Sequence, residues 1–145
     1  MQVGSPILGA ASGDYFGENT AINGNGTIVA GFAVNHDSNK GHVRVFHYTS
    51  TGNASWTQMG SDIDGESAND KSGYSVSLSS NGLIVAIGAI GNDGNGSNSG
   101  HVRIYEWNSG TYTWSQIGSD IDGEAANDMF GRSVSLSSDG SILAI

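Results

Sequence analysis

Short segments in which apolar and polar residues alternate recur along the chain. In GYSVSLSS, residues 73–80, every second residue is a serine, and the residues between them are tyrosine, valine and leucine. This alternation is typical of a half-buried strand. Asn81-Gly82 follows, a pair that tolerates the positive φ of a hairpin turn, and it leads into LIVAIGA at 83–89, which is apolar on both faces. We therefore expect a hairpin whose second strand is buried.

Two further strands are predicted in the same unit. GHVRIYEW, residues 100–107, places Val102 and Ile104 on one face and polar or aromatic residues on the other. The turn NSGTY then separates it from TWSQIGSD at 113–120. Four short antiparallel strands joined by turns form one small twisted sheet.

The unit is repeated. GSDIDGESANDKSGYSVSLSS at 60–80 recurs as GSDIDGEAANDMFGRSVSLSS at 118–138. Ser5, Ser61 and Ser119 hold equivalent positions, which gives periods of 56 and 58 residues and about two and a half copies. We therefore expect the chain to be a segment of a longer repeat array or a protomer that closes a ring with other copies of itself.

The repeat predicts an all-β fold, a partial or open β-propeller with blades of four antiparallel strands. A single sheet of this size cannot bury both faces, so neighbouring copies must pack on it. One propeller segment then spans residues 1–145. Its parts are the fourth strand of a preceding blade plus a connector at 1–15, blade 1 at 16–62, a connector at 63–72, blade 2 at 73–120, a connector at 121–130, and two strands of a third blade at 131–145.

Composition narrows the function classes. Glycine accounts for 23 of the 145 residues and proline for one, in keeping with many tight turns. With 14 acidic and 5 basic side chains the net charge is -9, which repels nucleic acid and anionic membranes. Cysteine is absent, so disulfides and thiolate metal sites are excluded. Neither a membrane-spanning apolar run nor a signal peptide is visible in the sequence, so we expect no membrane insertion.

The acidic phrase that opens each repeat is a candidate calcium site. In an extended stretch, alternate carboxylates project on one side, at a spacing that resembles the first, third and fifth ligands of a calcium loop. The match is partial, because Gly65 comes too early and no closing bidentate glutamate follows. The alternative is a solvated connector that blunts a strand edge. The candidate ligands are Asp62, Asp64, Glu66 and Asp70 in one copy, and Asp120, Asp122, Glu124 and Asp128 in the next.

The loop NDGNGSN, residues 92–98, is a candidate ligand contact. It lacks the lysine and the helix that a phosphate-binding glycine loop requires. We expect a mobile hairpin loop at one rim of the propeller, where ligands are commonly bound. Its candidate contact residues are Asn92, Asp93, Asn95 and Asn98.

Histidine and tryptophan have structural interpretations in this sequence. His42 and His101 occupy one repeated position, two residues before an arginine, where packing and hydrogen bonding are favoured over metal ligation. His36 and His47 belong to no evident group of functional residues. We expect the three tryptophans, Trp56, Trp107 and Trp114, to pack between blades rather than to hold a sugar.

Several short motifs resemble the FG-GAP repeat of the integrin alpha propeller and of many secreted and surface proteins. They are Phe16-Gly17 and Phe130-Gly131, the Gly88-Ala89-Ile90 triplet where the family usually has Gly-Ala-Pro, and the Gly-x-Val-x-[IV]-[FY] pattern of GHVRVF and GHVRIY. The resemblance implies a propeller used in recognition or adhesion, outside the cell or at its surface. The family's calcium loop is not carried over, because its positions hold Ser77, Ser79 and Asn81 here.

The function that these observations predict is a noncatalytic propeller module for binding or adhesion, stabilised by calcium if the acidic phrases bind it. Its expected partner is a protein or glycan at the loop rim, or further copies of itself. Neither G-x-S-x-G nor H-E-x-x-H is present, so no catalytic residue or cofactor is predicted. Two alternatives stay open: the propeller scaffold of a larger secreted enzyme, and a self-assembling partial propeller with a structural role.

Overall fold

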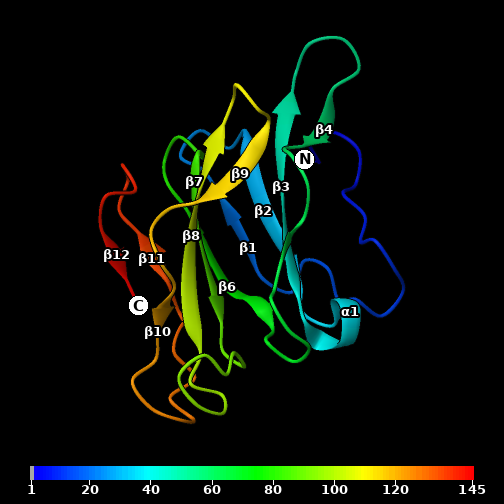
Figure 1. The fold of residues 1–145 in the computed structure, drawn as a ribbon. Coiled ribbons are helices and arrows are strands. Elements are labelled where there is room, and N and C mark those ends of the chain that lie inside the picture. Colours follow the sequence, from blue (N-terminus) through cyan, green and yellow to red (C-terminus); the bar gives the residue numbers. More distant parts are fainter. Residues whose placement is uncertain (1) are drawn as a thin grey trace.

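The computed structural model describes residues 2–145 and is built from antiparallel sheets (Figure 1). Met1, at the start of the predicted preceding strand, lies outside the described residues. Blade 1 contains β1 (Thr20–Ile22), β2 (Ile28–Ala33), β3 (His42–Thr49), β4 (Ser55–Gln58) and β5 (Ile63–Asp64). A short helical turn, α1 (His36–Asn39), lies between β2 and β3.

Blade 2 repeats this arrangement. It contains β6 (Ser72–Leu78), β7 (Ile84–Ala89), β8 (His101–Asn108), β9 (Thr113–Gln116) and β10 (Ile121–Asp122). A third, two-stranded sheet follows, formed by β11 (Ser135–Leu136) and β12 (Leu143–Ala144). The prediction of an all-β, open propeller segment with four-stranded blades is therefore confirmed.

The fourth strand of each blade is divided into two short pieces. In blade 1, β4 pairs with the end of β3 and β5 pairs with its beginning. Between the two pieces Gly60 has a φ of 71°, a conformation that interrupts a regular strand and that glycine adopts readily. The sheet thus extends two residues into the segment 63–72 that the sequence predicted as a connector.

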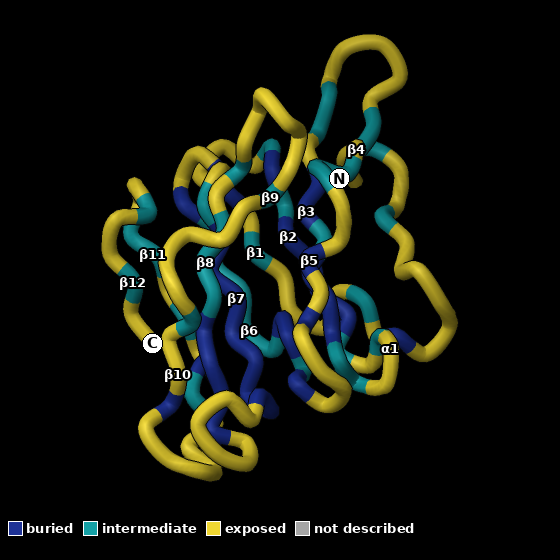
Figure 2. Tube along the Cα trace, in the orientation of Figure 1, coloured by how far each residue is buried: buried dark blue, intermediate teal, exposed yellow. Residues whose placement is uncertain are grey.

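The core lies between blades 1 and 2, where buried residues of β2, β3 and β7 meet (Figure 2). Phe32, Val45 and Ile87 are among its largest side chains, each at most 2% exposed. Val76, on the predicted inward face of β6, packs against this core, because β6 lies against β1 and β2. The two blades therefore stabilise each other by sharing apolar surface.

Hydrogen bonds between equivalent turns link successive blades. Gly24 N donates to Ser80 O at 2.9 Å, and Ser80 N donates to Ser138 O at 2.8 Å. The repeated bond shows that the third sheet follows blade 2 as blade 2 follows blade 1. Among residues 2–145 no helix has the length and apolar character to cross a membrane.

Candidate functional site

The loops at one end of the molecule form a continuous surface, which we call the rim. It consists of the β2–β3 loop (34–41), the β7–β8 loop (90–100) and the connectors 65–71 and 123–130, all at the lower end in Figure 1. Each connector is hydrogen-bonded along the preceding loop. Gly65 N donates to Gly41 O at 2.9 Å, and Gly123 N donates to Gly100 O at 2.8 Å.

Glycine makes this close approach feasible. Gly41 and Gly100 have φ values of 76° and 74°, in the left-handed region that favours glycine. A Cβ at Gly41 would collide with the backbone of Ser72, and one at Gly100 with the backbone of Phe130. The rim is therefore held in one arrangement by backbone contacts repeated in both blades.

The first acidic run is not gathered at one point, although Glu66 and Asp70 both accept from Asn92 Nδ2, at 3.4 and 3.3 Å. Asp62 accepts a hydrogen bond from Gln58 Nε2 at 2.7 Å. Asp70 is buried and caps a turn, accepting from the backbone N–H groups of Glu66 and Ser67 at 3.2 and 2.9 Å. Among residues 2–145, no group of three potential metal ligands contains more than one carboxylate of this run, so calcium binding by the run stays a prediction.

The second acidic run is divided in the same way. Asp120 accepts from Arg103 at 3.0 and 3.3 Å and from Gln116 at 2.6 Å. Burial alone would raise the pKa of Asp120, but the hydrogen bonds from Arg103 and Gln116, together with the charges of Arg103 and His101, outweigh burial and lower the pKa. Asp128 accepts from Ala125 N at 2.8 Å, as Asp70 does from Ser67 N. Within residues 2–145, the side chains of Asp122 and Glu124 have no hydrogen bond or ion pair.

A partly buried charged cluster joins the first connector to blade 2. Arg103 contacts Glu66 of the connector and Asp120 of its own blade. His101 lies beside them, its Nδ1 3.6 Å from Asp120 Oδ2 and 4.0 Å from Glu66 Oε2. Burial lowers the pKa of His101, and the neighbouring guanidinium of Arg103 lowers it further. The cluster therefore links successive repeats through charge-assisted contacts, in which the guanidinium of Arg103 lies between the carboxylates of Glu66 and Asp120.

Blade 1 carries the same pair in a modified setting. Arg44 Nε lies 3.7 Å from Asp62 Oδ1, and Arg44 donates to the carbonyl of Leu8 at 3.0 Å. The carbonyl of Leu8 thus contacts Arg44 as the carboxylate of Glu66 contacts Arg103 in blade 2. Burial lowers the pKa of His42, and the adjacent His36 lowers it further.

The predicted ligand loop, residues 92–98, is held by hydrogen bonds within itself and to the next connector. Asn92 is buried, and Asn98 N donates to Asp93 Oδ1 at 2.7 Å. Asn95 Nδ2 donates to the carbonyls of Gly123 and Glu124 at 2.9 and 3.1 Å. In place of the expected mobile hairpin, the structure has a loop bonded to the next connector, with the side chains of 93, 95 and 98 at the surface.

One group of residues was not predicted from the sequence. His36, His42 and Asp64 come together at the rim, with one ligand atom of each within 4.8 Å of the others. They lie on α1, β3 and β5, and no spacing rule links them. The recurrence of His42 as His101 was visible in the sequence, but His36 has no counterpart in the β7–β8 loop.

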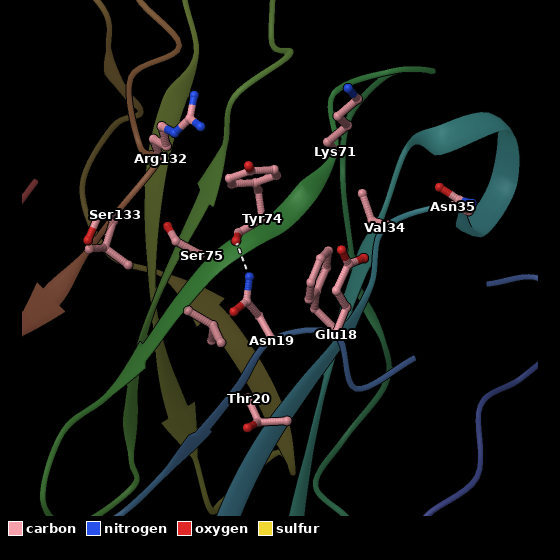
Figure 3. Close-up of a pocket in the computed structure, with 13 residues that line it drawn as sticks. Glu18, Asn19, Thr20, Val34, Asn35, Lys71, Tyr74, Ser75, Arg132 and Ser133 are labelled. Carbon is pink, nitrogen blue, oxygen red and sulfur yellow. Dashed lines mark hydrogen bonds between the residues drawn. The ribbon is translucent and has the colours of Figure 1, made fainter. Parts of the chain in front are cut away.

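A cavity of about 450 Å³ opens beside the inner strands (Figure 3). It lies among blade 1, β6 and the segment before β11, and it is crossed by a hydrogen bond of 2.6 Å from Asn19 Nδ2 to Tyr74 O. Lys71 and Arg132 line it together with Glu18. The cavity therefore mixes both charge signs.

The structural repeat agrees with a comparison against known protein families. Residues 62–105, from the end of blade 1 through β6, β7 and most of β8, match the FG-GAP repeat. The resemblance based on short motifs is thus confirmed for this segment. A search of curated proteins found no significant match.

Proposed function

We propose, starting from the FG-GAP repeat at residues 62–105, that this chain is a noncatalytic propeller module that binds a protein or glycan partner at its rim. The support is that the rim loops are ordered by bonds repeated in both blades, as at Gly65–Gly41 and Gly123–Gly100. A surface ordered before binding loses little conformational entropy when a partner docks. The proposed role is adhesion outside the cell or at its surface.

The charge of the rim indicates the chemistry of the partner. Several carboxylates of the rim are exposed, namely Asp37, Asp93, Glu124 and Asp128, and Asp122 at the end of β10, directly beside the rim, is exposed as well. The whole chain carries a net charge of -9. Such a surface attracts a basic protein surface and repels a sulfated glycan. The exposed carboxylates on an ordered rim are the observation that carries this proposal.

Octalysine is a suitable probe for the rim, and octaglutamate is the control peptide of opposite charge. We expect saturable, salt-sensitive binding of octalysine to the chain in interferometry. The double variant Asp122→Asn/Glu124→Gln removes two carboxylates that have no side-chain partner in the described chain. It should weaken binding about fivefold, equivalent to about 1 kcal/mol for two exposed charges.

The matched control removes the same charge away from the rim, as Glu106→Gln/Asp139→Asn. Glu106 is exposed on β8. The second repeat already has asparagine at the position of Asp139, where Asn81 makes equivalent turn bonds. Equal weakening by the two double variants would show that octalysine binding depends only on net charge, and would overturn the assignment to the rim. The absence of any weakening in the rim variant would overturn it as well.

A second candidate function, self-assembly into a ring, is favoured by the outer face of blade 1. This face contains an apolar cavity of about 670 Å³, lined among others by Phe16, Val29 and Trp56. Ile22 lies on it and is 63% exposed. The equivalent face of blade 2 packs against blade 1 within this chain, so the occupant that fits is the trailing face of a second copy.

A further inference from the structure

We propose that His36, His42 and Asp64 form a zinc site at the rim of blade 1. Their ligand atoms all lie within 4.8 Å of one another. His42 begins β3, and Asp64 is its direct partner across the β3–β5 pair. His36 is brought over them by the β2–β3 loop, whose next residues, Asp37 and Ser38, have φ values of 47° and 60°.

The buried imidazole of His42 provides the first independent support. Its side chain is fully buried, and neither ring nitrogen has a hydrogen-bond partner. Asp62 Oδ2 is the nearest carboxylate oxygen on one side, 3.5 Å from Nδ1. A buried polar group without a partner is costly. A metal ion bound to one of the two ring nitrogens would give that nitrogen a partner.

The orientation of His36 provides the second support. His36 Nδ1 lies 3.1 Å from Asp14 Oδ2, and Asp14 is itself buried. This contact leaves Nε2 as the nitrogen available to a metal. A carboxylate behind a ligating histidine fixes the ring and increases its basicity, as in many zinc sites. The rings of His36 and His42 lie with their centroids 4.1 Å apart.

The third ligand, Asp64, is free to bind. Its carboxylate has no hydrogen bond or ion pair among residues 2–145, and its residue is exposed. The exposed side of the site leaves room for water as a fourth ligand. Two imidazoles and one carboxylate suit zinc, whereas calcium and magnesium prefer oxygen ligands alone.

The second repeat shows why the site belongs to blade 1 alone. There the comparable group is Glu66, His101 and Asp120. Arg103 contacts both carboxylates and so places a fixed positive charge where an ion would bind. In blade 1, Arg44 pairs with Asp62 and not with Asp64.

Zinc titration of the whole chain by calorimetry tests the proposal. We expect one zinc per chain, and visible absorption typical of tetrahedral coordination when cobalt replaces zinc. In a tetrahedral site the ligand atoms are about 3.3 Å apart, so the exposed loop that carries His36 must close slightly on binding. His36→Gln and Asp64→Asn should each weaken zinc binding at least tenfold, and Asp14→Asn about 10-fold to 100-fold.

The controls are His47→Gln and Asp139→Asn, which remove a histidine and a carboxylate outside the site. Both residues are exposed, and neither belongs to the group of three. They should leave the zinc affinity unchanged, and calcium should not compete. Absence of saturable binding at one zinc per chain, or an equal loss in His36→Gln and His47→Gln, would overturn the proposal. Octalysine binding is measured in chelator, so the proposed function is tested separately.

Discussion

Burial of His101 makes the stability of the fold depend on pH. Its side chain is 3% exposed, and burial, followed by the charge of Arg103, lowers its pKa below the ordinary value of 6.5. The unfolded chain therefore takes up a proton near pH 6.5 that the folded chain resists. The contribution of the neutral ring to the free energy of unfolding is complete above that pH and is lost as the pH falls.

We expect the melting temperature in chelator to fall between pH 7.5 and pH 5.5, and His101→Gln to reduce the fall. His42 shifts in the same direction, so part of the dependence should persist. His47→Gln, at an exposed position, serves as the control and should keep the full dependence. A melting temperature that does not change with pH in the wild-type chain would contradict the prediction.

At the scale of elements, the fourth strands hold neighbouring repeats together through tryptophan. Trp114 on β9 donates from Nε1 to the carbonyl of Met59 at 2.8 Å. Trp56 donates in the same way to Val3 at 3.0 Å. Val3 therefore stands in the position of Met59, and the N-terminal segment takes the place of a preceding fourth strand.

Trp114→Phe keeps an aromatic ring but removes this hydrogen bond. We expect a loss of about 1–2 kcal/mol in the free energy of unfolding, because the carbonyl of Met59 loses its donor. Trp107→Phe is the matched control. Trp107 packs against Trp114 with ring centroids 5.3 Å apart, but its indole makes no hydrogen bond within the described chain. Equal losses for the two variants in urea denaturation would show that ring packing, and not the hydrogen bond, links the blades.

The strands themselves were largely predictable from the sequence. The predicted strand at 83–89 is β7, Ile84–Ala89, and the one at 100–107 is β8, His101–Asn108. Alternation identifies these strands because one face of each must be buried. The predicted strand at 113–120 ends earlier, at Gln116, because Gly118 has a φ of 71°, which interrupts a regular strand.

At the scale of the whole molecule, the open face of blade 1 predicts association of copies. We expect the mass measured by light scattering to rise with concentration, and Ile22→Asp to keep the chain monomeric. Burying an unpaired carboxylate in an apolar interface is unfavourable. Tyr112→Asp is the control, because Tyr112 is 73% exposed on a turn away from this face. A wild-type monomer at all concentrations would remove self-assembly as a function.

The repeat period, the strand pattern and the blade architecture were determined by the sequence alone, because each depends on residues that are neighbours along the chain or equivalent between copies. Which side chains come together to form candidate functional groups was decided by the tertiary structure. The sequence pattern predicts that Asp62, Asp64 and Glu66 lie on one side of an extended chain. In the structure they have different surroundings, because β5 pairs with β3 and Glu66 contacts Arg103 of blade 2. His36 meets Asp64 only because a loop folds back over two paired strands. Contacts between elements depend on loop conformation and strand register, which short-range patterns do not encode.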